Sequence, residues 1–296
     1  MSEAGVVVAE PPGTRAAAAR SLLRAVLRSP LGRFGLAVAV IFLATAALAP
    51  WLAPYDPTIQ SLGEVLRPPS RAHLLGTDQY GRDVLSQVVY GGRVSLQVAL
   101  VSVAVAGLVG VPLGVVAGYY GGRVDGVLMR LMDVIFAFPS LLLAIALVAF
   151  IGPSTVNVMI AIGAVYVATI ARITRASVLT VRTEDYVQAA RGLGKADLGI
   201  MLIHVLPNAL AAPLVQLTLG LARATLYEAS LSFIGLGTPP PTPSWGRMLA
   251  DTKSLVQLAP WTSVAPGTAI MLVILSFNFL GDALRDALDP RLRRLQ

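Results

Sequence analysis

Few side chains in this sequence are of the types that carry out chemistry, and those few are far apart. The 296 residues contain no cysteine and two histidines, His73 and His204. Disulfides, thiolate metal sites and thiol nucleophiles are therefore excluded, and two distant histidines without an HExxH motif do not form a zinc site. Arg223 and Glu228 interrupt a long apolar stretch, where ionisable residues are costly and often functional. We expect charge recognition there, and no catalytic, metal-binding or cofactor-binding residue.

Hydrolysis of ATP by this chain is not expected either. A phosphate-binding loop needs the pattern GxxxxGK[ST] after a strand. The nearest string, Gly-Leu-Gly-Lys at residues 192–195, lacks both the length of that pattern and the preceding strand. The chain is therefore predicted not to be an enzyme.

The composition predicts a membrane protein. Hydrophobic residues make up 55% of the chain and charged residues 13%, with a mean hydropathy of +0.72. So little polar surface cannot cover the apolar mass in water, which predicts an all-α chain that crosses a lipid membrane several times. The net charge of +7 would suggest nucleic acid as the partner of a soluble chain. In a membrane chain we expect basic loops that orient the helices instead, and no nucleic-acid partner.

Six apolar stretches approach the ~20 residues that a spanning helix needs. They cover roughly residues 34–53, 96–119, 131–151, 156–173, 209–234 and 263–284. The first ends in Ala-Pro-Trp, a poor cleavage context, so we expect an uncleaved span rather than a signal peptide. Glycines and Pro112 interrupt the second, which predicts that other helices surround it. The third contains Phe138 and Pro139.

The rest of the sequence divides around these spans. We expect an N-terminal segment 1–33, an extramembrane segment 54–93, a core 94–284 with a polar loop at 183–208, and a tail 285–296. Asp78, Gly81 and Asp83 predict turns and a helix cap in the extramembrane segment. Most of the 23 lysines and arginines fall in the two termini and in the loops after the second and fourth spans. The positive-inside rule therefore places both termini and the polar loop in the cytoplasm.

The polar loop contains no apolar run long enough to cross a bilayer, and its pattern predicts two short helices. Thr183 can cap the first helix, and Gly194 is a natural terminator. Asp197 can cap the second helix, at residues 198–206, and Pro207 then predicts a break before the next span.

One narrow face of the first short helix is predicted to be mostly small and apolar. Tyr186, Ala189, Ala190 and Leu193 recur at helical spacing, whereas Gln188 and Arg191 point elsewhere. Small side chains allow another surface to come close, so this face is a candidate contact with a partner protein.

The same loop resembles the "EAA" loop of binding-protein-dependent ABC importer permeases. Gln188-Ala189-Ala190, then Gly194, then Leu206-Pro207 match that loop in spacing. Two positions depart from it, since Gln188 stands where the family has Glu and His204 where it has Ile. A histidine at this position, with Leu-Pro-Asn at residues 206–208, is similar to the peptide/nickel subgroup. The resemblance implies that the loop docks into an ATPase subunit through Tyr186, Gln188, Ala189, Ala190, Arg191, Gly194, Leu206 and Pro207.

Other stretches are similar to dipeptide and oligopeptide permeases of the C type, namely residues 76–96, 138–142 and 228–249. The resemblance implies a type I ABC importer permease fold with six transmembrane helices, in a bacterial or archaeal cell membrane. It also implies the partners: a homologous second permease, two ATPase subunits that bind ATP and Mg, and an extracytoplasmic binding protein. The expected cargo is a dipeptide or oligopeptide, with nickel complexes or glutathione as alternatives.

Two other classes of protein compete with this interpretation. A self-sufficient secondary transporter usually carries inverted repeats, and no such repeat is visible here. An intramembrane hydrolase needs a base and nucleophile or metal ligands within the membrane, and both histidines fall in loops. For the fifth span we expect Arg223 to line a water-filled pathway, and Glu228 to lie towards its outer end or at the interface between the permeases.

Overall fold

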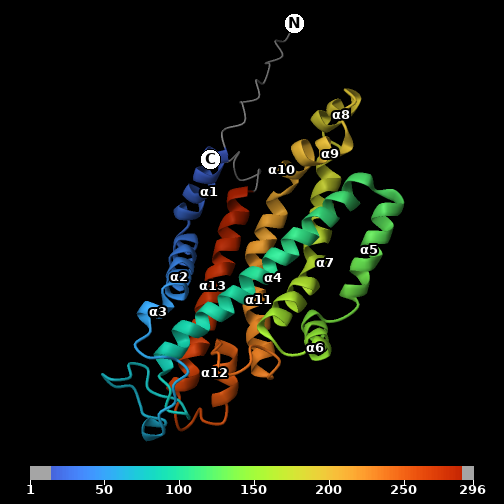
Figure 1. The fold of residues 1–296 in the computed structure, drawn as a ribbon. Coiled ribbons are helices and arrows are strands. Elements are labelled where there is room, and N and C mark those ends of the chain that lie inside the picture. The colour runs from blue at the N-terminus through green and yellow to red at the C-terminus, as the bar shows by residue number, and fades with distance from the viewer. Residues whose placement is uncertain (1–14, 289–296) are drawn as a thin grey trace.

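The computed structural model describes residues 15–288, and most of these residues are helical (Figure 1). Five long helices run along the molecule: α2 (Pro30–Ala47), α4 (Val84–Tyr120), α7 (Thr155–Val181), α11 (Ala211–Phe233) and α13 (Trp261–Leu288). Residues 1–14 and 289–296, which include much of the predicted terminal segments, lie outside the described part. Within that part, an isolated bridge between Thr77 and Asp83 is the one β-type contact.

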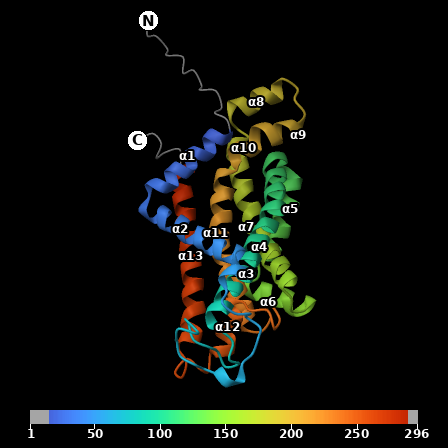
Figure 2. The same cartoon turned by 60° about the vertical axis from the view of Figure 1, so that its left-hand side comes forward.

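The molecule has two ends of different construction, shown from two directions in Figures 1 and 2. We call one the α8 end; it carries α8 (Asp185–Gly192), α9 (Asp197–Gly199) and α1 (Arg15–Arg28). We call the other the α12 end; it carries α12 (Trp245–Thr252) and residues 54–83, with the short 3-10 helix Leu62–Glu64. The first described helix and the end of α13 thus lie on the same side as the polar loop.

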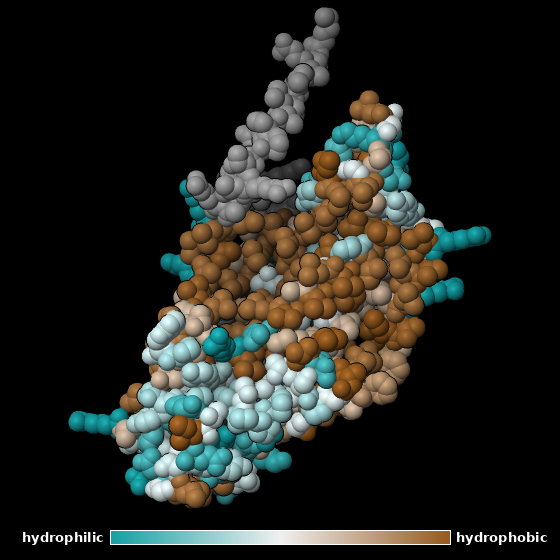
Figure 3. All heavy atoms as spheres, viewed as in Figure 1, coloured by the Kyte–Doolittle hydropathy of each residue, from teal (hydrophilic) through white to brown (hydrophobic). Residues whose placement is uncertain are grey.

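The helices between these ends are long and apolar enough to cross a membrane. Four of them qualify singly, namely α2, α4, α7 and α13, and two bent helix pairs bring the total to six when each pair counts as one span. Figure 3 shows the corresponding belt of apolar side chains between more polar ends. The all-α fold with up to six spans is therefore as predicted.

The third predicted span, residues 131–151, is wrong as a single helix. The structure has α5 (Gly122–Phe136) and α6 (Ser140–Ile151), which meet at an angle of 85°. Pro139 lies between them, and a proline both lacks an N–H and drives the preceding residue out of the helical region. The break therefore falls at residues 137–139. Ion pairs of Asp125 with Arg175 and of Asp133 with Arg172 hold α5 against α7.

The second predicted span and the capped helix predicted at the end of the extramembrane segment are one helix of 37 residues, α4. It begins where predicted, because the Asp83 carboxylate caps it by accepting a 2.7 Å hydrogen bond from the Ser86 N–H. It ends at Gly121, whose φ of +67° lies in the region that favours glycine. One continuous helix therefore connects the α12 end to the α8 end.

Glycines bring α4 against α7 on one side, whereas Leu100, Leu108 and Val109 on its other side are exposed, so the second span is packed on one side and not surrounded as predicted. Gly110, Gly114 and Gly118 recur every four residues and face α7. A Cβ placed on Gly110 or Gly118 would come within 2.9 Å of a side chain of α7. Spacing of this small-xxx-small kind lets helix backbones approach closely. The side chains that fill this seam from α7 belong to Ile170, Thr174 and Val178.

Candidate functional site

The predicted docking loop forms at the α8 end and begins with α8. The prediction that Thr183 caps α8 is wrong, because the N-cap is Glu184. The Thr183 hydroxyl instead donates a 2.8 Å hydrogen bond back to the Thr180 carbonyl at the end of α7. A free carbonyl of the last turn competes with the cap for such a hydroxyl. Asp185 in the first turn still favours the start of α8 through the helix dipole.

Gly194 terminates α8 as predicted. Its φ of +73° is one that side chains rarely adopt. The Gly194 N–H donates to the Arg191 carbonyl at 3.0 Å, and the Lys195 N–H donates to the Ala190 carbonyl at 3.3 Å. These are the two bonds of a Schellman motif, in which the chain turns back on itself. The following helix therefore packs against α8.

That second helix starts differently from the prediction. Ala196 is its N-cap, and Asp197 does not cap it. The Asp197 carboxylate accepts a 2.7 Å hydrogen bond from the Tyr119 hydroxyl at the end of α4. Local spacing assigned the Asp197 carboxylate to the helix cap, but a hydrogen bond from Tyr119, a residue distant in the sequence, occupies it instead.

Pro207 does not break the helix at the predicted place. A π-helix (Ile200–Val205) precedes α10 (Leu206–Ala209), which contains the proline in its first turn. Proline lacks an N–H and crowds the carbonyl four residues earlier, and wider π turns relieve such a defect. The chain bends later, around Leu210, where this second helix meets α11 at 59°.

The predicted small face of α8 divides into two parts. Tyr186 and Leu193 are 44% and 82% exposed, and Ala189 is exposed as well. Ala190 is only 4% exposed and packs inside the chain with Val187. The predicted face is therefore wrong at Ala190, since helical spacing gives the width of a face but not the edge at which the chain itself covers it. We call Tyr186, Ala189 and Leu193 the α8 outer face.

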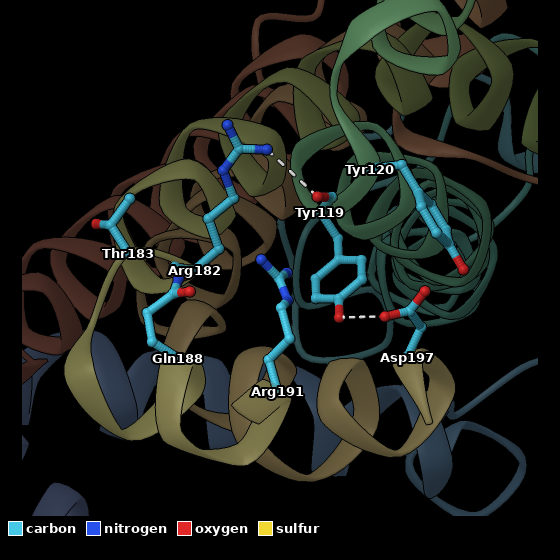
Figure 4. A pocket seen from close by; sticks show the side chains of 7 residues that line it. All are labelled: Tyr119, Tyr120, Arg182, Thr183, Gln188, Arg191 and Asp197. Carbon is cyan, nitrogen blue, oxygen red and sulfur yellow. Dashed lines mark hydrogen bonds between the residues drawn. The ribbon is translucent and has the colours of Figure 1, made fainter. Parts of the chain in front are cut away.

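The opposite side of α8 lines a polar pocket of ≈ 470 Å³ between the loop and the ends of α4 and α7 (Figure 4). Gln188 and Arg191 reach it from α8, as their predicted direction away from the small face requires. The Arg191 guanidinium lies over the Tyr119 ring, 5.2 Å from its centroid. The remaining residues of the lining are Tyr119, Tyr120, Arg182, Thr183 and Asp197.

Hydrogen bonds around this pocket fasten the loop to the two long helices. The Gln188 amide donates a 2.7 Å bond to the carbonyl of Arg182, the C-cap of α7. Glutamine can donate this bond and an ionised glutamate cannot, which gives the departure from the EAA pattern a structural role. The Arg182 guanidinium in turn donates to the carbonyls of Gly118 and Tyr119 at 2.8 and 3.2 Å. A cation there also suits the negative end of the α4 dipole.

The structure separates the two ionisable residues of the fifth span. Glu228 is 1% exposed, and its carboxylate accepts 2.8 Å hydrogen bonds from Ser95 and Ser232. The expectation that Glu228 lies on the pathway or at an interface is therefore wrong, because these hydroxyls enclose it within the chain. Arg223 is exposed on the other side of the same helix. The burial of Glu228 could have been anticipated in part from the sequence. Ser232 follows Glu228 by one helical turn, so its hydroxyl can reach the carboxylate.

The α12 end holds a polar network that the sequence did not predict. His73 is 6% exposed, and its ring nitrogens lie 2.9 Å from Asp83 and 3.2 Å from Glu64. Burial lowers the pKa of His73, but the bonds to the two carboxylates outweigh it and raise the pKa above the ordinary 6.5. Among residues 15–288, no three His, Cys, Asp or Glu side chains are placed to hold a metal ion.

Comparison with known proteins agrees with this architecture. Residues 110–294 match the family described as binding-protein-dependent transport system inner membrane component. Residues 19–69 match the N-terminal TM domain of oligopeptide transport permease C. The chain is 43% identical to the dipeptide transport system permease protein DppC of Alkalihalophilus pseudofirmus, over 93% of this chain and 90% of that protein. It is 45% identical to the di/tripeptide transport system permease protein DppC of Pseudomonas aeruginosa, over 88% of each chain.

Solved structures show the same fold at low sequence identity. The MetNI methionine ABC transporter in inward-facing conformations gives a TM-score of 0.56 at 18% identity, covering 69% of this chain and 96% of that one. An amino acid ABC transporter with histidines gives 0.53 at 19% identity, covering 68% and 94%. The chain therefore belongs to the family of binding-protein-dependent transport system inner membrane components, the multi-pass permeases of ABC importers.

Proposed function

We propose that this chain is the pore-forming permease subunit of an ATP-driven, binding-protein-dependent importer of dipeptides or oligopeptides. The observation that carries the proposal is the α8 loop, which presents exposed apolar side chains and is bonded to α4 through Asp197 and to the end of α7 through Gln188. Exposed apolar surface at one end of a membrane protein is typical of a protein contact. The names of the relatives supply the cargo class.

The proposed contact is an ATPase subunit on the cytoplasmic side. The α8 outer face would touch it, with Gln188, Arg191 and Gly194 fixing the shape of the loop and Ala190 packing it internally. Leu206 and Pro207, in α10, would connect the loop to the bend before α11. When ATP and Mg, bound by two partner ATPases, drive them together, the loop would carry α4 and α7 with it as a rigid lever. This chain needs no cofactor of its own in such a scheme.

The remaining partners follow from the orientation. The basic α1 and the α8 loop would face the cytoplasm, together with the termini. The α12 end would face outward, where an extracytoplasmic binding protein delivers cargo. A homologous second permease would complete the pathway, since one bundle of this size does not enclose a pore by itself.

Glutathione is the second candidate cargo. The chain is 40% identical to the glutathione transport system permease protein GsiD of Pectobacterium atrosepticum, over 86% of this chain and 85% of that protein. Glutathione is itself a small peptide with free carboxylates, so both candidates need recognition of similar chemistry. Uptake of labelled glutathione and of labelled dipeptide by the same complex distinguishes them.

The docking proposal is tested by Ala189→Glu. A carboxylate buried without a partner at a protein contact costs several kcal/mol, so we expect the ATPase subunits to be lost on co-purification and uptake to fall with them. Ala196→Glu is the matched control, because Ala196 is exposed in the same loop but lies outside α8. Normal assembly and uptake with Ala189→Glu would refute docking through the α8 outer face.

A further inference from the structure

A polar stripe runs along α11 through the middle of the membrane belt. Gln216, Arg223, Tyr227 and Ser230 follow one another at intervals of seven, four and three residues, and none of them is buried. At ~100° per residue they fall within about 60° of one another around the helix. The stripe extends over roughly 21 Å at 1.5 Å per residue. Most of the thickness of a ~30 Å hydrocarbon layer therefore meets a polar surface on this side of α11.

Tyr166 of α7 joins the stripe from the neighbouring helix. Its hydroxyl donates a 3.0 Å hydrogen bond to the Gln216 carbonyl and accepts a 2.8 Å bond from the Gln216 amide. The Arg223 cation lies close enough to interact electrostatically with Tyr166. One hydroxyl and one amide of this region, those of Tyr166 and Gln216, are thus bonded to each other.

No carboxylate within residues 15–288 pairs with that cation. Arg223 forms no hydrogen bond and no ion pair there. Glu228 lies about 140° away around α11 and is occupied by Ser95 and Ser232. An arginine facing lipid at the middle of a span is strongly disfavoured, so water or an anionic group must meet it.

The opposite side of α11 is apolar. There Leu214, Leu217 and Leu221 line an apolar groove shared with Leu100 and Leu108 of α4. Leu214 lies nine residues before Arg223, which is half a turn around the helix. One helix therefore presents a polar and an apolar free surface in opposite directions, as a helix between an aqueous pathway and lipid or a packed subunit would.

We propose that the stripe faces the aqueous pathway and that Arg223 binds the free carboxylate of the peptide that passes through. This inference rests on the proposed function and names the chemical group recognised within it. A guanidinium pairs with a carboxylate through two parallel hydrogen bonds. Tyr227, one turn further along, offers a hydroxyl beside it, whereas the hydroxyl of the buried Tyr166 is already donated to Gln216. The site would hold the peptide by its charge and leave its side chains free, which suits cargo of varied sequence.

The position of the stripe is tested first by accessibility. Because the chain has no native cysteine, Arg223→Cys and Leu214→Cys can each carry the one reactive thiol of this subunit in the assembled complex. A water-borne methanethiosulfonate should modify Cys at 223 and leave Cys at 214 unmodified. Leu214 is 45% exposed and nearer the α8 end, so poor reaction there cannot result from depth. Equal reaction at both positions, or reaction at neither, would overturn the proposal.

The charge is tested by rescue. Arg223→Cys should lower kcat for dipeptide uptake by roughly 10- to 100-fold, the loss expected for one charge-assisted hydrogen-bonded pair. KM should stay the same where delivery by the binding protein sets it. Attaching an aminoethyl group to the cysteine restores the cation and should restore most of the rate, whereas a methyl group should not. Rescue by both groups, or uptake unchanged by the substitution, would contradict carboxylate binding.

Recognition of the carboxylate is tested without the binding protein, so that the selectivity of the binding protein does not affect the result. Alanylalanine should slow modification of Ser230→Cys in the membrane complex, and its C-terminal carboxamide should not. In Arg223→Gln/Ser230→Cys neither compound should slow it. Protection by the carboxamide, protection that survives Arg223→Gln, or no protection at all would each overturn the inference.

Failure of this inference and failure of the proposed function look different. If the unsubstituted complex takes up dipeptides and the Arg223 variants behave like it, only the role of Arg223 is wrong. If the unsubstituted complex does not take up peptide, the proposed function itself is wrong. If the Arg223 variants no longer co-purify with the other subunits, Arg223 is a structural residue at a subunit contact, and the inference fails.

Discussion

The two ends of the molecule differ in how they hold their carboxylates, although both expose large apolar side chains. At the α8 end, large apolar side chains such as Leu193, Leu198 and Ile203 are left exposed. At the α12 end, carboxylates such as Asp78 and Asp83 are buried and bonded within the chain. Burying a charge is tolerated only with such partners. The carboxylates of the α12 end are therefore satisfied within the chain, whereas Glu184 and Asp185 at the α8 end are exposed. Both ends leave apolar side chains free for another protein, since Leu62 and Leu74 of the α12 end are 84% and 62% exposed.

The α12 end is also joined within the chain by packing and by ion pairs. The Trp245 ring of α12 is 1% exposed, and its indole N–H donates a 2.9 Å bond to the Val88 carbonyl of α4. Arg82 pairs with Asp78 at 2.7 Å and reaches Asp251 of α12 at 3.7 Å. The segment before α4 and the segment after α11 are thereby joined. A motion that starts at the α8 end would reach the α12 end through the long helices rather than through a loose lid.

The largest contrast expected between the ends is in their exposure to the two aqueous compartments. Lys195 and Lys253 are both exposed, one at each end. With single cysteines at these positions, an impermeant maleimide added to intact cells should label position 253 and not position 195. Permeabilised cells, in which both should react, are the control. Labelling of position 195 from outside would place the α8 end away from any cytoplasmic ATPase.

The same substitution in each end should have unequal effects on stability. A Cβ on Gly246 would come within 2.6 Å of the Ala229 Cα, so Gly246→Ala must push α12 away from α11. We expect a loss of about 1–3 kcal/mol, the usual cost of overpacking. Nothing lies within 4 Å of a Cβ on Gly192, so Gly192→Ala should be neutral or slightly stabilising. Thermal unfolding of the two variants measures the difference, and equal effects would mean that the ends are packed alike.

A smaller effect is expected from loosening the α8 end alone. Gln188→Ala removes the amide bond to the Arg182 carbonyl, worth about 1 kcal/mol. Amide hydrogens of α8 should then exchange roughly five times faster, while those of α12 keep their rates. Hydrogen exchange followed by mass spectrometry reads both helices in one experiment. Unchanged exchange in α8 would show that the other contacts of the pocket hold the loop without Gln188.

The smallest effect is a pH dependence confined to the α12 end. Because the pKa of His73 is raised above 6.5 in the folded state, its contribution to stability is fully present below that value and is lost as pH rises through the raised pKa. The charged groups that face it are Asp83 and Glu64, with Arg67 paired to Glu64 at 3.9 Å. The melting temperature should fall slightly over this range, and His73→Asn should remove the dependence. A dependence that persists in His73→Asn would assign it to another group.

Much of the fold could be predicted because it depends on local sequence. The lengths of the apolar stretches predict the spans, and Asp83 caps the helix that follows it. Gly194 ends α8 with a φ of +73°, a backbone conformation that favours glycine. The 85° bend between α5 and α6 was missed because a proline inside an apolar run is compatible with either a kink or a complete break. Helix α12 was missed because the prolines before it predict a loop.

The site was less predictable, since its roles depend on contacts between distant residues. Periodicity defined the face of α8, but only the packing of Ala190 against the rest of the chain shows where that face ends. Asp197 was assigned to a local cap, whereas Tyr119 of another helix takes it. Glu228 and Arg223 are both ionisable residues within one apolar stretch of the sequence. In the structure Glu228 is buried, because Ser95, more than a hundred residues away, donates a hydrogen bond to its carboxylate, whereas Arg223 is exposed.

The tilt of the continuous helix α4 is expected to depend on the thickness of the membrane. Its 37 residues extend about 55 Å, and the part from residue 94 to residue 120 alone about 40 Å, against ~30 Å of hydrocarbon. Figure 1 shows it crossing the bundle at a slant to α11 and α13. A thinner bilayer favours more tilt and a thicker one less. Since one end of α4 anchors the α12 end and the other holds the α8 loop, acyl-chain length would shift the balance between transporter conformations without any lipid binding at a specific site.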